Sequence, residues 1–243
     1  MDSTFRLETA QPGVVRLLQL SDTHLFAQAE RTLLGVNTRE SFLAVLQQVA
    51  DEAEPFDMVL VTGDISQDYS AASYQFFAAQ IETQVLCGRW QMVLLNSEVY
   101  AAAHGWLQRS QLEYLSACAR EHPELHLLCS LHHLPRLVGS AWLDTQTLHN
   151  QDEFHAVCRD LPSLRVVLSG HVHQEYDETI AGVRYLATPS TAIQFEPRSP
   201  DFMLSALPPG WRYLELREDG SIETRVCRLS HGHFEPSFSA SGY

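Results

Sequence analysis

The chain has 243 residues, enough for one large domain or two small ones, and its 45% hydrophobic content permits a substantial buried core. With 16 basic and 30 acidic residues the net charge is −14, so the overall field repels long polyanions, and we expect no nucleic-acid polymer as a partner. No apolar run approaches the roughly 18 residues of a membrane span and the N-terminus lacks a basic start with an apolar core, which predicts a cytoplasmic protein without a membrane partner.

The first part of the sequence predicts a parallel strand–helix–strand unit. Residues 14–20 (VVRLLQL) form a short apolar run that ends at SDTH, as a buried strand with a polar exit would. The spacing of apolar residues over 37–53 predicts a helix, with Asn37 or Thr38 as its N-cap. Residues 57–64 (DMVLVTGD) repeat the first pattern, and this alternation is typical of a parallel sheet.

The rest of the chain continues this alternation and then changes to short strands. The Asp-Gly pair within 210–229 is a hairpin turn signal. We find no internal repeat, low-complexity tract or linker, and therefore expect one domain over 1–243. The predicted elements are helices at 70–81, 108–121 and 152–161, strands at 90–96, 125–131, 164–170 and 182–188, and a hairpin over 210–229.

Five cysteines are scattered along the chain, and none forms a Cys-x-x-Cys pair. An odd number without paired spacing is typical of reduced thiols rather than a disulfide framework. We expect them to be small buried hydrophobic residues. They are Cys87, Cys118, Cys129, Cys158 and Cys227.

Four predicted strands end in residues that are common metal ligands. In open α/β sheets, ligands bind beyond the carboxyl ends of the strands, where these residues would gather. Asp-x-His and His-x-His place two side chains on the same side of an extended segment, because side chains alternate with period two. The residues are Asp22 and His24 (LSDTH), Asp64 (TGD), His132 and His133 (LHHLP), and His171 and His173 (SGHVH).

Mixed carboxylate and imidazole donors favour a divalent transition ion such as Mn, Fe or Zn over Ca or Mg. Five or six ligands are too many for one catalytic zinc and suit two ions about 3.5 to 4 Å apart that share a bridging carboxylate. A single Asp after a strand is more often a turn or cap residue, and a single His-x-His is often on the surface. The joint occurrence of both at consecutive strand exits favours the metal interpretation.

These blocks resemble those of the calcineurin-like metallophosphoesterases. LSDTHLF, VTGDISQD, LHHLP and LSGHVHQE are similar to the motifs of that family, and the full set resembles the bacterial class III 3′,5′-cyclic-AMP phosphodiesterases. The resemblance to this subfamily extends to LLGVNTRES, AWLDTQTLHN, LATPSTAIQFEP, LPPGWRYLEL and the closing SGY. It implies an α/β four-layer sandwich, in which two mixed β-sheets lie face to face and are flanked by helices.

The resemblance also implies a role for each ligand and a reaction. It implies hydrolysis of 3′,5′-cyclic AMP to 5′-AMP, by a hydroxide that two metal ions activate. Substrate contacts are in addition expected from His24 and His173. Since the family's ligand lies two residues before the proline, His133 is chosen over His132, which is then a supporting or packing residue. The implied ligands are Asp22, His24 and His173 for one ion, His133 and His171 for the other, and Asp64 as the bridge.

One block of the family is absent from this sequence. It is Gly-Asn-His followed by an acidic residue, which would supply an Asn ligand and the His that assists the leaving oxygen. It belongs near Thr83–Gln84, where a helical pattern runs directly into VLCGRWQMVLL, whose CGR resembles a hairpin turn. Neither Asn96 nor His104 has the flanking residues of the motif, so we assign the missing roles to neither.

Two explanations of this absence stay open. Removal of a central strand would leave unpaired backbone groups in the main sheet, so we favour an active-site segment that the printed sequence omits over a chain that lacks it. A continuous peptide requires Thr83 and Gln84 Cα atoms about 3.8 Å apart. If the chain lacks the segment, a nucleotide-binding protein without catalysis becomes an alternative.

Substrate and assembly are less constrained by the residues. A broader phosphoesterase acting on 2′,3′-cyclic nucleotides or other phosphodiesters is an alternative enzyme, because the metal core is common to all. Asn150 and the segment ATPSTAIQF are candidates for adenine contacts by resemblance alone. We expect a monomer or a homodimer.

Overall fold

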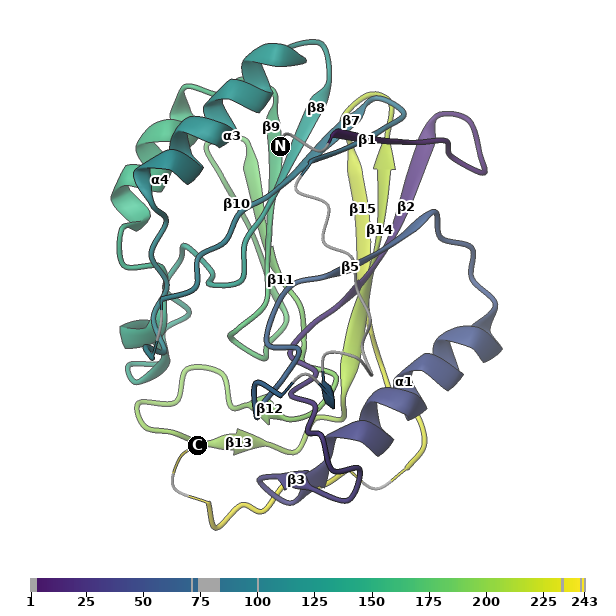
Figure 1. Ribbon diagram of the computed structural model, residues 1–243, viewed down its shortest axis with the longest axis vertical. Coiled ribbons are helices and arrows are strands. Elements are labelled where there is room, and N and C mark those ends of the chain that lie inside the picture. Colours follow the sequence, from purple (N-terminus) through teal and green to yellow (C-terminus); the bar gives the residue numbers. More distant parts are fainter. Residues whose placement is uncertain are drawn as a thin grey trace.

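Two β-sheets pack face to face, and helices cover the outer face of each (Figure 1). The computed structural model describes residues 4–70, 72–73, 84–99, 101–232, 234–240 and 242. Within them, no helix is both long enough and apolar enough to cross a lipid bilayer.

The smaller sheet has four strands in the order β15-β14-β2-β5. β2 and β5 are parallel neighbours, whereas β14 is antiparallel to both β2 and β15, so the sheet is mixed. The predicted parallel unit and C-terminal hairpin are therefore both confirmed. The strands are β2 (Val14–Leu20), β5 (Met58–Val61), β14 (Gly210–Arg217) and β15 (Ile222–Arg228).

The larger sheet has seven strands in the order β1-β6-β7-β8-β9-β11-β10. It is also mixed, because β6 is antiparallel to β7 and β10 to β11 while the remaining neighbours are parallel. The strands are β1 (Thr4–Leu7), β6 (Gln84–Cys87), β7 (Trp90–Leu94), β8 (His126–Ser130), β9 (Leu164–Ser169), β10 (Tyr176–Ile180) and β11 (Val183–Ala187). Two short pairs complete the described strands: β3 (Thr32–Leu33) with β4 (Val36–Asn37), and β12 (Gln194–Phe195) with β13 (Leu204–Ser205).

The alternation of side chains along β2 shows how the layers form. Val15 and Leu17 are buried in the core between the sheets, whereas Leu18 and Leu20 pack with α1 (Thr38–Glu52) on the other face. On the outer face of the larger sheet lie α3 (Arg109–Glu121) and α4 (Gln151–Arg159), and a 3₁₀ turn spans Leu143–Gln146. The predicted four-layer sandwich is confirmed, and the single-domain assignment stays a prediction.

Helix α1 begins as the sequence predicts. Asn37 is its N-cap, because the side-chain oxygen accepts a hydrogen bond from the backbone N–H of Glu40. The helix ends at Ala53, which adopts a left-handed conformation with φ of 50°. This helix connects β2 to β5 and so places the exits of both strands at the same end of the sheet.

The structure changes one expectation about the region of the absent block. The predicted helix over 70–81 falls largely outside the described residues, as does Thr83, so the Thr83–Gln84 separation stays untested. CGR forms the predicted hairpin turn, with Gly88 at φ of 56° between β6 and β7. Since β6 pairs with β1 and β7, the expected gap inside a sheet is not found among the described strands. Instead β5 is an edge strand, with Val59 44% exposed.

Candidate metal centre

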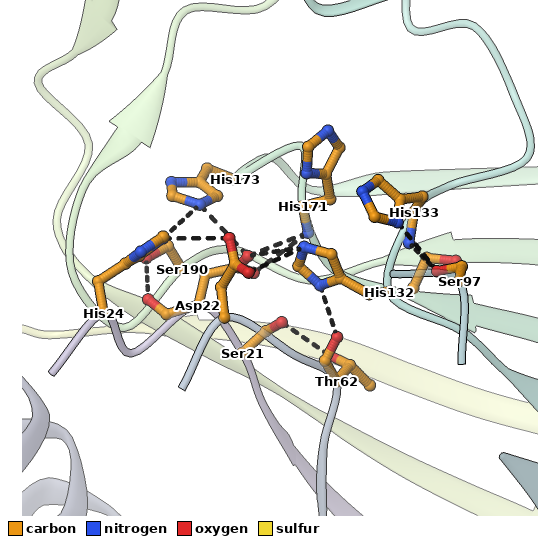
Figure 2. A network of polar contacts seen from close by, with 12 residues as sticks. Ser21, Asp22, His24, Thr62, Ser97, His132, His133, His171, His173 and Ser190 are labelled. Atoms are coloured by element: carbon orange, nitrogen blue, oxygen red, sulfur yellow. Dashed lines mark hydrogen bonds and ion pairs between the residues drawn. The ribbon is translucent and has the colours of Figure 1, made fainter. Parts of the chain in front are cut away.

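The polar side chains at the four predicted strand exits lie close together, and Figure 2 labels those that follow β2, β8 and β9. Asp22 and His24 follow β2, Asp64 follows β5, and the pairs His132–His133 and His171–His173 follow β8 and β9. Within the described residues, three groups of side chains each bring their ligand atoms within 4.8 Å of one another. These groups are Asp22, His24 and His173; Asp22, Asp64 and His132; and His132, His133 and His171.

The backbone at these exits is in an unusual conformation. Five of the six predicted ligands have positive φ angles between 43° and 67°. This left-handed region is sparsely populated by residues other than glycine, although Asp and His enter it more readily than most. Such backbone conformations persist where the surrounding fold enforces them and often mark functional sites. The five residues are Asp22, His24, Asp64, His171 and His173.

The first group is held so that its acceptor atoms face one another. His24 Nδ1–H donates to Gln67 Oε1 at 2.7 Å, and His173 Nδ1–H donates to the carbonyl of Ile193 at 2.9 Å. These bonds leave the Nε2 lone pairs of the two rings 3.2 Å apart, with His173 Nε2 3.3 Å from Asp22 Oδ1. The ring of Phe195 stacks on His173 with centroids 4.4 Å apart and fixes its plane.

His132 lies between the two carboxylates. Its Nδ1–H donates to the carbonyl of Thr62 at 2.8 Å, and its Nε2 lies 3.5 Å from Asp64 Oδ1 and 3.9 Å from Asp22 Oδ1. A Cβ atom on Gly63 would lie 2.1 Å from His132 Nδ1, so glycine is needed there to admit the ring. Sequence reasoning placed His132 among supporting or packing residues, whereas the structure places it in the centre of the cluster.

His133 and His171 occupy the side of the cluster nearer β8. The hydroxyl of Ser97, which is buried, lies 2.9 Å from His133 Nδ1 and also accepts the backbone N–H of His133 at 3.3 Å. The backbone N–H of His171 donates to Asp22 Oδ1 at 3.1 Å, which joins β9 to β2. His171 Nε2 is buried and has no hydrogen-bond partner.

The electrostatics of the cluster favour neutral imidazoles beside ionised carboxylates. Burial lowers the pKa of His24, of His133 and of His171, the last to about 3. Burial alone would raise the pKa of Asp22, but His173 and His132 outweigh it and the pKa falls to about 2.

Asp64 and His132 form the charged pair of the cluster. Burial within the cluster would raise the pKa of Asp64, but His132 and His24 beside it outweigh this effect and hold the pKa well below its usual range. The side chain is 43% exposed. Burial would lower the pKa of His132, but Asp64 and Asp22 raise it to about 9. Two ionised carboxylates in one site thus demand a positive charge between them.

These observations fit a centre for divalent transition-metal ions. Neutral His and ionised Asp are the states that ligate such ions. A ligating imidazole usually donates its other ring N–H to an oxygen, such as that of a carbonyl or an amide. The Nε2 atoms of His24 and His173 face one another, and the Nε2 atom of His171 has no hydrogen-bond partner. A cation suits all three nitrogens as a binding partner.

Several candidates from the sequence lie outside the cluster. Asn96 is exposed and its side chain accepts the backbone N–H of Glu98, while His104 stacks on His149 with centroids 3.8 Å apart. Asn150 donates to and accepts from the backbone of Leu107, so its amide is used within the fold.

Residues of the segment ATPSTAIQF contact Asp22 and His173 and hold them in place. The hydroxyl of Ser190 donates to the backbone carbonyl of Asp22, and Ile193 and Phe195 hold His173. The sequence did not indicate Ser97 or Gln67, because no local pattern marks a residue that contacts a ligand far away in the sequence. Phe195 belongs to a segment considered for adenine contacts, and its contact with His173 was not predicted.

Comparison with known proteins agrees with this geometry. The model of the family described as calcineurin-like phosphoesterase matches residues 15–175. The chain belongs to the calcineurin-like phosphoesterase family. The matched range contains all the strand exits described above, so the predicted family is confirmed.

Curated relatives match nearly the whole chain. A 3′,5′-cyclic adenosine monophosphate phosphodiesterase, CpdA, of Escherichia coli K12 is 40% identical, with 100% of both chains covered. The CpdA of Vibrio vulnificus is 41% identical over 97% of this chain and 98% of its own. A 3′,5′-cyclic-nucleotide phosphodiesterase of Nostoc is 33% identical over 93% and 97%.

The alignment with the E. coli relative also shows a difference in length. It runs over 275 positions, of which this chain fills at most 243, so at least 32 positions of the alignment have no residue of this chain. The relatives thus carry segments that are not present here.

Solved structures support the fold assignment. A dimetal phosphatase of Danio rerio has a TM-score of 0.56 at 13% identity, with 90% of this chain and all of that chain covered. GAP50 of Plasmodium has a TM-score of 0.57 at 9% identity, with 94% and 90% covered. At such identities the similarity extends to the fold alone, and it agrees with the two-sheet sandwich.

Proposed function

We propose that this chain hydrolyses 3′,5′-cyclic AMP to 5′-AMP. The observation that carries the proposal is the convergence of carboxylates and imidazoles from four strand exits in a chain similar over its full length to cyclic-AMP phosphodiesterases. The reaction breaks the bond from phosphorus to the 3′ oxygen, and water supplies the new oxygen on phosphorus.

We assign Asp22, His24 and His173 to one ion, His133 and His171 to the other, and Asp64 to both. The grouping of Asp22, His24 and His173 supports the first assignment, and Asp64 groups with Asp22 and His132. His132 is an additional candidate ligand in its neutral form, since its Nε2 faces both carboxylates. Divalent Mn, Fe or Zn ions, when bound, polarise the phosphoryl oxygens and favour in-line attack by water.

The chain's own residues have two tasks in this reaction. The two carboxylates and the neutral imidazoles provide the donor atoms of the centre. His24 and His173, which we assign to contacts with the substrate phosphate, are held in place by Gln67 and Phe195. The bound ions would supply the local positive charge that the substrate phosphate needs against the overall charge of −14.

A specific observation supports a second candidate function. The sequence contains no Gly-Asn-His block, and at least 32 positions of the E. coli alignment, which spans 275 against 243 residues here, are unfilled. A chain without the Asn ligand and the leaving-group His would be a nucleotide-binding protein with little or no turnover.

Measurements of substrate hydrolysis and of the intact mass together distinguish the candidate functions. The purified protein with added Mn²⁺ would be assayed with 3′,5′-cyclic AMP, 2′,3′-cyclic AMP and an aryl phosphodiester, and its intact mass would be measured. We expect preferential hydrolysis of the 3′,5′ isomer. Faster hydrolysis of the other two substrates supports a broader phosphoesterase.

Saturable cyclic-AMP binding without product, at a mass of 27.4 kDa, supports the binding protein and contradicts the enzyme. A larger mass would reveal a segment beyond the printed sequence. Location in the cytoplasm and a monomeric or homodimeric state stay predictions.

A further inference from the structure

Gln19 is a polar residue in a position that the strand pattern assigns to the apolar core. It follows Val15 and Leu17 on the face of β2 that points between the two sheets, and it is fully buried. A buried amide without partners is costly, so its hydrogen bonds decide whether it belongs there.

The amide of Gln19 bonds to three other strand ends. Its Nε2 donates to the hydroxyl of Thr62, just after β5, at 3.0 Å, and to the carbonyl of Ser169, the last residue of β9, also at 3.0 Å. Its Oε1 accepts from the hydroxyl of Thr188, just after β11. Because a carbonyl only accepts, the bond to Ser169 fixes the orientation of the amide.

The bonds to Ser169 and Thr188 join the two sheets, whereas the bond to Thr62 stays within the smaller sheet. The backbone N–H groups of Thr62 and Thr188 bond within one sheet, to Leu20 and Ser169 respectively. The Thr62 hydroxyl passes the network on to the Ser21 hydroxyl at 2.7 Å. Gln19 therefore connects the ends of β2 and β5 to those of β9 and β11.

The strand ends that Gln19 joins lead directly to the cluster. Asp22 lies three residues after Gln19, Asp64 two residues after Thr62, and His171 two residues after Ser169. Two of the three ligand groups combine donors from both sheets, so the separation of the sheets at this level sets the separation of those donors. We infer that Gln19 is a positioning residue, which sets the spacing of the metal-binding side chains across the two sheets.

The chain offers a matched control for this inference, which rests on the proposed metal centre. Gln91 is a second fully buried glutamine, on β7, and neither atom of its side-chain amide has a hydrogen-bond partner. It pairs with Leu127 near the start of β8, at the end of the sheet remote from the strand exits. Gln19→Met and Gln91→Met both remove a buried amide, but only the first removes hydrogen bonds between the sheets.

The test is calorimetric titration of each folded variant with Mn²⁺, followed by kcat and KM for cyclic AMP at saturating Mn²⁺. We expect Gln19→Met to weaken Mn²⁺ affinity by about 10- to 100-fold and to lower kcat more than it raises KM. We expect the Mn²⁺ affinity of Gln91→Met to stay within about threefold of the wild-type affinity, whatever the melting temperature of this variant. Unchanged Mn²⁺ affinity in Gln19→Met, even at a lower melting temperature, would overturn the inference.

A milder pair of variants decides the matter if Gln19→Met does not fold. Thr188→Val removes the hydroxyl that donates to Gln19, and Thr188→Ser keeps it. We expect about threefold or more weaker Mn²⁺ binding in the valine variant and recovery in the serine variant. Equal affinity in both would contradict the inference. A wild-type protein that binds no Mn²⁺ would overturn the metal centre itself, whereas binding without hydrolysis would overturn only the proposed reaction.

Discussion

The Nε2 atoms of His24 and His173 lie 3.2 Å apart although 149 positions separate the two residues in the sequence. Both rings use Nδ1–H to donate to an oxygen, so two nitrogen lone pairs face each other beside Asp22. A cation is the partner that satisfies all three groups.

Removal of metal ions is therefore expected to destabilise the protein. A free ion at 100 times its Kd adds about 2.7 kcal/mol to the free energy of unfolding. For a chain of this size that is a rise in Tm of about 5 to 10 °C, since each kcal/mol is worth about 2 to 4 °C. Thermal denaturation after chelation and after Mn²⁺ addition measures it, and an identical Tm in both states would contradict the metal centre.

Substitution of Asp64 is expected to abolish both metal binding and hydrolysis. Its carboxylate lies 3.5 Å from His132 Nε2 and 3.8 Å from His24 Nε2, so Asp64→Ala removes a carboxylate donor from the cluster. We expect a loss of more than about 100-fold in kcat/KM, together with lower metal content by elemental analysis.

The control for Asp64→Ala is Asp219→Ala. Asp219 lies in the turn between β14 and β15, and its carboxylate bonds to Ser221. That turn is near the start of β2, away from the strand exits. Wild-type activity in Asp64→Ala, or equal losses in the two variants, would refute the assignment.

Gly170→Ala is expected to disturb the first group of ligands by a steric clash rather than by backbone strain. The added Cβ would lie 2.2 Å from Ser21 Oγ and 2.9 Å from Asp22 Oδ2. Such overpacking costs about 1 to 3 kcal/mol, and we expect weaker metal binding as Asp22 shifts.

Gly182→Ala provides the comparison, because its Cβ would meet nothing within 4 Å while its φ is 84°. That variant is expected to lose about 1 to 2 kcal/mol of stability without any change in metal affinity. Urea denaturation and Mn²⁺ titration of both variants test this contrast, which fails if the two variants lose metal affinity equally.

A change at the start of α1 is expected to affect stability alone. Asn37→Ala removes the acceptor for the Glu40 N–H, and the free energy of unfolding should fall by about 0.5 to 2 kcal/mol. Asn37→Asp keeps an acceptor oxygen and should lose less. Urea denaturation measures the difference, and a loss in Asn37→Asp as large as that in Asn37→Ala would argue against the cap.

The architecture was predictable because its signals are local. The apolar runs of β2 and β9 and the helical spacing of α1 each occupy a short window, and polar residues directly after a strand mark its exit. β1 was missed, because a four-residue edge strand has too few residues for a periodic pattern.

The support of the site was not predictable, because it depends on distant contacts. Ser97 contacts His133 across 36 positions, and Phe195 stacks on His173 although β10 and β11 lie between them in the chain. Neither residue type suggests a ligand-holding role. Likewise His132 and His133 are adjacent in the sequence, and only the fold places one ring beside Asp64 and the other against Ser97.

The bond from the His171 N–H to Asp22 Oδ1 has a consequence for folding. It joins residues 149 positions apart, on strands of different sheets. Closing so long a loop costs conformational entropy, and the local contacts formed early in folding do not offset it. Contacts between residues so far apart in the sequence therefore form late in folding. The donor set is then complete only after both sheets have docked, and metal ions act on a nearly native chain, where they slow unfolding rather than accelerate collapse.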